Sequence, residues 1–274
     1  MANIQLIATD LDGTFLADDK TFDHALFRTV LTQLKAHHIA FAIATGVHQT
    51  RINRIMAGFL NDGINFVSNN GARVVTGDGL VLYERAIPRA TLAQIAALIT
   101  NFEPKPDQGV VYSTDDTAYI PREFATTVMD KHLKYFQHIV IFDNVADIAE
   151  PIFKVTMNWR DFDELQFYTA AKKALGHAVH VTETGTGAID IVPAGVNKAV
   201  GLQVLADHLG IEMAHVAAFG DGGNDVEMLT HVGYPFIMPK TTLVGDFLPV
   251  VADNNHDGVS RTILQLLAKN DAPY

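Results

Sequence analysis

The chain has 274 residues, of which 48% are hydrophobic and 19% are charged, and its formal net charge is −11. This acidic balance argues against a nucleic-acid partner, because phosphate backbones require a basic stripe. The chain has no cysteine, which excludes disulfides, thiolate metal sites and cysteine nucleophiles. Since neither a signal peptide nor a membrane-length apolar segment is recognised, we expect a cytoplasmic protein with no membrane partner.

The N-terminal part of the chain alternates short apolar segments with helical patterns. The predicted strands here are residues 4–9, 39–45 and 64–68, and the predicted helices are residues 23–37 and 48–60. The same rhythm returns later, with helices over 197–209, 224–231, 241–248 and 257–268 and strands over 215–219, 234–238 and 249–252. Short apolar strands separated by amphipathic helices are typical of a parallel sheet covered on both faces.

The middle of the chain has a different pattern. Residues 72–84 predict a hairpin around Gly77-Asp78-Gly79. Helices over 88–101, 122–134 and 161–175 then alternate with strands over 110–114, 138–142, 153–159, 178–182 and 187–192. We therefore predict an α/β protein whose core is a doubly wound, Rossmann-like parallel-sheet domain (residues 1–82 and 193–274). An α+β cap domain (residues 83–192) is inserted into it.

Polar side chains follow several of the predicted core strands directly. Open parallel sheets bind ligands at the carboxyl ends of their strands. The residues at these ends are Asp10 and Asp12 after the first strand, Thr45 and Gly46 after the second, and Asp221, Asn224 and Asp225 after residues 215–219. Lys198 lies at the start of the predicted helix over residues 197–209. We expect all of them at one edge of one sheet.

These residue types suit phosphoryl transfer. Carboxylates bind Mg²⁺, a hard ion that also takes substrate phosphate. Thr45, the amides after it and Lys198 can donate to phosphate oxygens. Asp10 is placed to attack phosphorus and form an aspartyl-phosphate. Asp12, two residues on and facing the same way, can protonate the leaving oxygen and later activate water.

Four segments in order, "DLDGTFL", "ATG", "VNK" and "GDGGNDVEML", resemble the motifs of the haloacid dehalogenase superfamily of phosphotransferases. "SNNGA", "PAGVNKAVGL" and "DGV" are similar to its Cof-type sugar-phosphatase branch. The resemblance implies a nucleophile at Asp10 and a general acid/base at Asp12. It implies phosphate binding by Thr45, Gly46, Lys198 and Asn224, and Mg²⁺ binding by Asp10, the backbone carbonyl of Asp12, Asp221 and Asp225.

The function predicted from these features is a Mg²⁺-dependent phosphatase for a small phosphorylated metabolite, such as a sugar phosphate. A phosphomutase and a phosphate-sensing receiver without turnover remain as alternatives. Relatives often have arginine where this chain has Val47, and either His48 or Arg51 is a candidate to replace it. Thr45 can also be read as a helix N-cap, and Asp225 as a structural residue. The substrate and the oligomeric state are left open.

Overall fold

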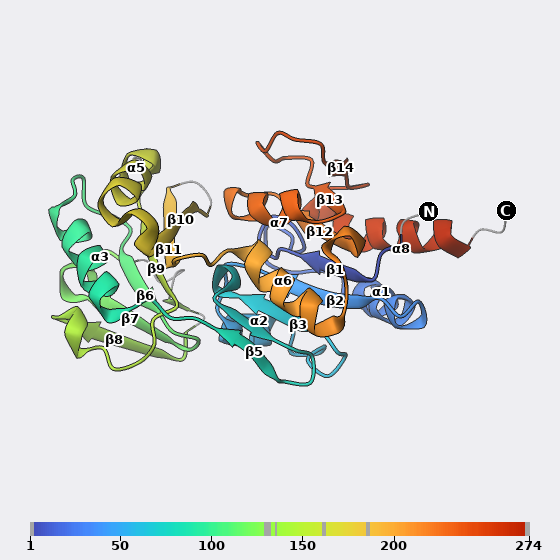
Figure 1. Cartoon of the computed structure of the whole chain (residues 1–274), viewed down its shortest axis with the longest axis horizontal. Coiled ribbons are helices and arrows are strands. Elements are labelled where there is room, and N and C mark those ends of the chain that lie inside the picture. The colour runs from blue at the N-terminus through green and yellow to red at the C-terminus, as the bar shows by residue number, and fades with distance from the viewer. Residues whose placement is uncertain (1–2, 129–132, 135, 161–162, 185–186, 272–274) are drawn as a thin grey trace.

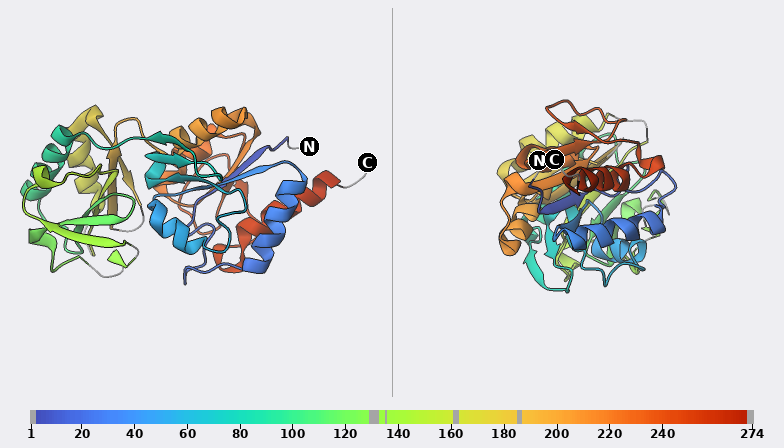
Figure 2. Two further views of the ribbon diagram at one scale, coloured as in Figure 1. Left: turned by 90° about the horizontal axis from the view of Figure 1, so that it is seen from below. Right: turned by 90° about the vertical axis from the view of Figure 1, so that its right-hand side faces the viewer.

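The structure, a computed structural model, describes residues 3–128, 133–134, 136–160, 163–184 and 187–271. The chain forms two β-sheets that lie toward opposite ends of an elongated molecule, as Figure 1 shows. One sheet has eight strands and the other has six. Both termini lie at the end of the molecule away from the six-stranded sheet (Figures 1 and 2).

The eight-stranded sheet has the strand order β14-β13-β12-β1-β2-β3-β4-β5. Six strands are parallel: β1 (Leu6–Thr9), β2 (Ala40–Ala44), β3 (Asn65–Ser68), β12 (Val216–Gly220), β13 (Tyr234–Ile237) and β14 (Leu248–Pro249). The remaining two, β4 (Arg73–Val75) and β5 (Val81–Glu84), form the antiparallel hairpin predicted around the Asp-Gly turn. Four of the parallel strands, β1, β2, β3 and β12, are short and almost entirely buried, because helices cover both faces of the sheet there.

Helices pack on each face of this sheet. On one face lie α1 (His24–Ala36), α2 (Gln49–Ile55) and α8 (Gly258–Asp271), and on the other lie α6 (Lys198–Leu209) and α7 (Val226–His231). Strand β1 shows the division, since Ile7 packs into the first apolar cluster and Leu6 and Ala8 pack into the second. The predicted doubly wound α/β architecture is confirmed. This sheet and its helices (residues 3–84 and 198–271) are called the core region below.

The six-stranded sheet has the order β10-β11-β9-β6-β7-β8. Its strands are β6 (Val110–Ser113), β7 (Thr117–Pro121), β8 (His138–Phe142), β9 (Lys154–Asn158), β10 (Val179–Glu183) and β11 (Ala188–Pro193). All neighbouring pairs are antiparallel except β7 and β8. Helices α3 (Arg89–Asn101) and α5 (Glu164–Leu175) cover one face through an apolar cluster of their own. This sheet and its helices (residues 89–193) are called the cap region.

Short 3₁₀ turns complete the fold: η1 (Asn69–Gly71), η2 (Arg122–Phe124), η3 (Val145–Asp147), η4 (Gly176–Ala178), η5 (Met213–His215), η6 (Gly223–Asp225) and η7 (Asn254–His256). Within the part of the chain that the structure describes, no helix combines the length and the apolar character needed to cross a membrane.

The large sheet includes β5 as far as Glu84, and the small sheet includes β11 as far as Pro193. The division into domains at residues 82 and 193 stays a prediction.

Four elements differ from the prediction. The helix expected over 241–248 is wrong, because Thr241 Oγ1 donates to the Asp221 carbonyl (2.7 Å) and accepts from the Leu243 amide (3.0 Å). These bonds favour an irregular loop, which leads into β14, shorter than the strand expected over 249–252. The helix expected over 122–134 is a 3₁₀ turn and bends up to residue 128, and residues 129–132 of that prediction lie outside the described residues. Strand β7 was not predicted.

Candidate active site

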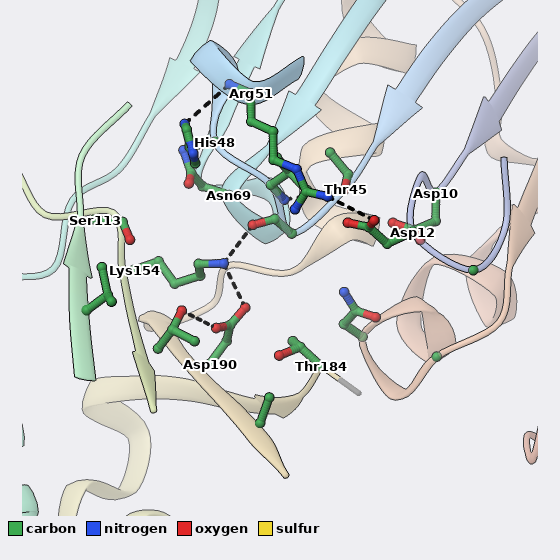
Figure 3. A pocket seen from close by; sticks show the side chains of 18 of the residues that line it. Asp10, Asp12, Thr45, His48, Arg51, Asn69, Ser113, Lys154, Thr184 and Asp190 are labelled. Carbon is green, nitrogen blue, oxygen red and sulfur yellow. Dashed lines mark hydrogen bonds and ion pairs between the residues drawn. The ribbon is translucent and has the colours of Figure 1, made fainter. Parts of the chain in front are cut away.

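A pocket of about 470 Å³ lies between the core region and the cap region. Its core side is made by the loops that follow β1, β2, β3 and β12, so it sits at the carboxyl edge of the parallel strands, as predicted. Its cap side is made mainly by side chains from β6, β9 and β11. Figure 3 shows side chains from both regions pointing into the same space.

Three carboxylates of the core region come together at the floor of the site. Asp10, Asp221 and Asp225 each offer an oxygen, and these oxygens all lie within 4.8 Å of one another. Asp10 follows β1, and the other two follow β12, which pairs with β1 in parallel register. Neighbouring parallel strands therefore bring together residues that are more than 200 positions apart in the sequence.

Lys198 is fully buried beside this cluster at the first residue of α6. Its Nζ donates to Asp10 Oδ1 and to Asp225 Oδ1, each at 2.6 Å. Burial works against its charge, but the two carboxylates outweigh burial, and the pKa of Lys198 is raised. The side chain is therefore a fixed ammonium group beside the candidate nucleophile.

The other oxygen of Asp225 accepts the amide N–H groups of Asp221 (2.9 Å) and Gly222 (3.0 Å). Both oxygens of this fully buried carboxylate are therefore used within the protein. Asp225 orients Lys198 and the loop that carries Asp221, which is the structural role left open by the sequence. Asp221 Oδ1 in turn accepts the hydroxyl of Thr14 at 2.7 Å.

The charge balance of the cluster fits a divalent cation. With all three carboxylates ionised, the single ammonium group of Lys198 would leave two negative charges without compensation. Burial raises the pKa of Asp10 and of Asp221, and their carboxylate neighbours add to the rise. Oxygen donors with this excess of negative charge are the ligands that Mg²⁺ prefers.

Asp12 lies on the same loop as Asp10, but its carboxylate binds cationic side chains. Asp12 Oδ1 lies 2.9 Å from the Arg51 guanidinium and 2.8 Å from the Lys20 ammonium (Figure 3 shows the contact with Arg51). Burial tends to raise the pKa of Asp12, but these two cations outweigh it and hold the pKa below its ordinary value. His48 and Arg51 were the two candidates to replace the arginine that relatives often have at position 47. Of these two, Arg51 contacts Asp12, a candidate catalytic group.

Two glycines make the close approaches of the site sterically feasible. Gly13 has φ +84°, and a Cβ there would lie 2.5 Å from Asp221 Oδ2. A Cβ on Gly46 would lie 2.9 Å from Asn70 Oδ1. Side chains at these two positions would separate the loops that carry the polar groups.

Three of the four predicted phosphate-binding residues, Thr45, Gly46 and Asn224, line the pocket, and Lys198 is fully buried beside the carboxylates. Thr45 is buried, and its Oγ1 accepts the Val47 amide at 3.3 Å. Helix α2 begins later, with His48 as its N-cap, so Thr45 does not cap it. The Nδ2 of Asn224 donates to Asn70 Oδ1 at 3.0 Å.

A polar network that was not predicted from the sequence joins the Thr45–Gly46 loop to the cap region. Lys154 Nζ donates to the Gly46 carbonyl at 2.7 Å and lies 3.0 Å from the buried carboxylate of Asp190 (Figure 3). Asp190 also accepts from Asn70 Nδ2 at 2.9 Å and from Thr156 Oγ1 at 2.6 Å. The cap-region residues alternate with apolar ones along their strands, so nothing local distinguishes them from an ordinary strand.

A second contact between the regions is made by Asp115, at the β6–β7 turn. Its carbonyl accepts His48 Nδ1 at 2.8 Å, and its carboxylate accepts Asn69 Nδ2 at 3.1 Å and binds the Arg73 guanidinium. The ring of His48 stacks on Phe136, with centroids 4.1 Å apart. Burial lowers the pKa of His48 to about 4, so the ring is neutral and donates from Nδ1.

A doubly wound sheet with a buried aspartate–lysine pair and a cluster of three carboxylates at its carboxyl edge fits a hydrolase or a phosphotransferase. The sequence profile of the haloacid dehalogenase-like hydrolases matches residues 7–263. The chain belongs to this family, which confirms the resemblance seen in its motifs.

Individual relatives extend over the whole chain. The chain is 31% identical to the 5-amino-6-(5-phospho-D-ribitylamino)uracil phosphatase of Escherichia coli, over 99% of each protein. It is 27% identical to the HMP-PP phosphatase of Klebsiella pneumoniae, over 98% of each. A solved structure from Streptococcus mutans, 26% identical, superimposes with a TM-score of 0.87 over 97% of this chain and 99% of that one.

Proposed function

We propose that the chain is a Mg²⁺-dependent phosphatase that hydrolyses a small phosphorylated metabolite through an aspartyl-phosphate on Asp10. The observation that carries this proposal is the buried Lys198 ammonium, 2.6 Å from Asp10, beside a cluster of three carboxylates. Membership of a hydrolase family and relatives named as phosphatases support the same chemistry. Action in the cytoplasm remains a prediction from the sequence.

Asp10 and Asp221 are the side chains we propose to hold Mg²⁺, together with the Asp12 backbone carbonyl. Each of these two carboxylates uses Oδ1 in a hydrogen bond, to Lys198 and to Thr14 respectively, so each has a second oxygen to offer. Asp225 is not one of these proposed ligands. It contributes negative charge next to them and orients Lys198. When bound, Mg²⁺ would neutralise charge on the phosphate and on the carboxylates around it.

In the first step, a carboxylate oxygen of Asp10 attacks phosphorus, and the bond from phosphorus to the ester oxygen breaks. Asp12 gives its proton to the ester oxygen, which leaves as an alcohol. Lys198, Thr45 and the Gly46 backbone hold the phosphate oxygens during the transfer. In the second step, Asp12 takes a proton from water, which attacks the aspartyl-phosphate, releases phosphate and regenerates Asp10.

Asp12 must carry a proton for the first step, whereas its ion pairs with Arg51 and Lys20 favour the ionised form. A phosphate group entering the pocket competes for both cations, because it brings two negative charges. We propose that substrate binding draws Arg51 and Lys20 toward the phosphate and so frees Asp12. Arg51 then has a substrate contact, despite the valine at position 47.

The pocket position of Asp12 favours an enzyme over a receiver without turnover, because a receiver gains little from a general acid beside its phosphorylated aspartate. A phosphomutase would use the same aspartyl-phosphate but pass it to a second hydroxyl group. The inserted segment of residues 83–192 is proposed to act as a cap over this site. The polar bridges from Lys154 and Asp115 support that arrangement.

The proposal is tested by phosphate release from p-nitrophenyl phosphate and a panel of sugar phosphates, with Mg²⁺ or EDTA. We expect Mg²⁺-dependent release by the wild type and a loss of at least about 10³-fold in Asp10→Asn. Interconversion of sugar 1- and 6-phosphates, measured with a bisphosphate activator, separates a mutase from a phosphatase. Wild-type rates in Asp10→Asn would refute the aspartyl-phosphate mechanism.

A further inference from the structure

The two sheets end in four edge strands, which differ in how they are protected. The edges of the eight-stranded sheet are β14 and β5, and those of the six-stranded sheet are β10 and β8. An edge strand presents a row of unpaired backbone N–H and C=O groups, and these are a template for pairing with another chain. Natural proteins therefore protect edges with proline, charged residues, bulges or a covering segment.

Three of the four edges carry one of these protections. Strand β14 is two residues long and ends in Pro249. The register of β5 with β4 shifts between Val74 and Val75, an irregularity of the kind that twists an edge away from a partner. Strand β10 is covered by the core region, where His180 Nε2 lies 3.3 Å from Glu227 Oε1. Pairing with another chain is opposed at each of them.

Within the described residues, β8 has none of these protections. Its sequence, His-Ile-Val-Ile-Phe, contains no proline, aspartate, glutamate, lysine or arginine, and its register with β7 is continuous. Ile139 is 54% exposed, Val140 is 38% exposed and Ile141 is 47% exposed, so apolar side chains on both faces of the strand are open to solvent. Figure 1 shows β8 at the lower border of the cap region.

Half of the backbone groups of β8 point away from the sheet. The His138 N–H donates to the Asp116 carbonyl at 3.1 Å, so in this parallel pair the backbone groups of alternate residues, starting with His138, face β7. The N–H and C=O groups of Ile139 and Ile141 point to the other side. Among the strands that the structure describes, none pairs with β8 on that side. Two donors and two acceptors are therefore available to a further strand.

An antiparallel second copy of β8 satisfies all four groups. With Val140 on a twofold axis, Ile139 lies opposite the partner's Ile141, and each of the two equivalent pairs exchanges two hydrogen bonds. Apolar side chains then meet apolar side chains on both faces of the sheet.

The charges near β8 do not oppose this contact. The chain has a net charge of −11, which works against self-association in general. At the end of β8, however, the Asp143 carboxylate accepts two hydrogen bonds from the Arg122 guanidinium, one of them at 2.9 Å. The acidic group nearest the strand is therefore neutralised within its own copy.

We propose that β8 is a dimerisation edge, through which two copies of the chain pair antiparallel about a twofold axis at Val140. The contact joins the two six-stranded sheets into one continuous sheet. Because the same strand of each copy forms the contact, it closes on itself and stops at two copies. This inference is independent of the proposed phosphatase function.

The chain has no cysteine, so single-cysteine variants report the contact directly. In Val140→Cys the two Cα atoms would lie about 4.5 Å apart, within disulfide reach, and we expect a covalent dimer after mild oxidation with copper–phenanthroline. Ile139→Cys would hold its cysteines more than about 7 Å apart, beyond disulfide reach. Val244→Cys, at a position that is 97% exposed, measures cross-linking by random collision. If Val140→Cys cross-links no faster than either of these two variants, the proposed contact is wrong.

Sedimentation equilibrium measures the association without a cross-link. We expect the wild type to pass from the monomer mass to the dimer mass as its concentration rises. In Ile139→Lys the dissociation constant should rise at least about tenfold, because a lysine on an edge strand opposes pairing. Val244→Lys adds the same charge at another exposed position and should keep the wild-type constant.

Ile141→Pro gives a second way to break the contact. It removes an outward N–H group and keeps the bonds to β7, so it should weaken the dimer as well. A wild type that is monomeric at every concentration, or that forms oligomers larger than two, would overturn the proposal. A dimer that survives both Ile139→Lys and Ile141→Pro would place the contact on another surface.

Discussion

In the core region, the charged groups of the pocket stand mainly on loops at the carboxyl ends of parallel strands, whereas in the cap region they stand on the strands themselves. The core side concentrates charge: Lys198 and three carboxylates lie in direct contact or within 4.8 Å. On the cap side of the pocket, Lys154 and Asp190 are paired with each other at 3.0 Å. The difference fits the proposed function, in which the core region binds the phosphate group and the cap region contacts the rest of the substrate.

The sharpest test of the core side is Lys198→Met. It leaves two carboxylates, Asp10 and Asp225, buried without their shared cation, so we expect the free energy of unfolding to fall by about 3–5 kcal/mol. Phosphatase activity should fall by at least about 10³-fold, because the phosphate loses a fixed positive charge. Urea denaturation and phosphate release measure the two effects.

Two companion variants locate the cause of these losses. Lys35→Met, on the exposed face of α1, is expected to change neither quantity. Adding Asp225→Asn to Lys198→Met removes one of the unpaired charges and should restore part of the stability but not the activity. If Lys198→Met alone is as stable as the wild type, the charge balance described for this site is wrong.

Binding of Mg²⁺ gives a second test of the core side. A cation that binds only the folded protein stabilises it by about 2.7 kcal/mol at one hundred times its dissociation constant. We expect Mg²⁺ to raise the thermal unfolding midpoint of the wild type, and EDTA to reverse the shift. In Asp221→Asn the shift should be much smaller, because one of the two proposed side-chain ligands has lost its charge. An equal shift in both proteins would place the cation elsewhere.

The chemistry of the core side was predictable because it depends on topology. Parallel strands end at one edge, so residues that directly follow the strands, such as Asp10, Thr45 and Asp221, meet there whatever their separation in sequence. The ion pair between Arg51 and Asp12 was not predictable, because it depends on the side-chain conformation of a residue two helical positions after the start of α2.

The cap side could not be read in the same way. Lys154, Thr156 and Asn158 have the alternation of any half-buried strand, and only the packing of that strand against the core region gives them a role. Asn70 joins Asp190 to Asn224 through its two amide ends, a contact that spans both regions and has no local sequence signal beyond its place in "SNNGA". Strand β7 was missed because its polar start, Thr117, follows directly on the acidic turn at Asp115.

The contact between the two regions is tested by Lys154→Met. It removes the bond to the Gly46 carbonyl and leaves the buried Asp190 carboxylate without its cation, although Asn70 and Thr156 still donate to it. We expect a loss of about 1–3 kcal/mol in unfolding free energy and a fall of about tenfold in kcat/KM. Lys173→Met, on the exposed side of α5, is the matched control. Unchanged kinetics in Lys154→Met would mean that the phosphate loop does not need the cap region for its position.

The last prediction is a pH dependence of stability that comes from His48. Its pKa in the folded protein is about 4, mainly because the ring is buried, against an ordinary value of 6.5. The unfolded chain therefore binds the proton more tightly, and the stabilising contribution of the neutral ring is present above pH 6.5 and is lost as the pH falls toward 4. At pH 5 the loss amounts to about 2 kcal/mol relative to neutral pH.

His48→Gln has a side chain that does not titrate but can still donate to the Asp115 carbonyl. We expect the wild type to lose more stability than this variant between pH 7 and pH 5, as measured by urea denaturation at each pH. Because His48 stacks on Phe136 and binds the β6–β7 turn, the same experiment reports whether the cap region stays docked on the core region at low pH. Parallel pH profiles for the two proteins would contradict the lowered pKa of the His48 ring and its burial against Phe136.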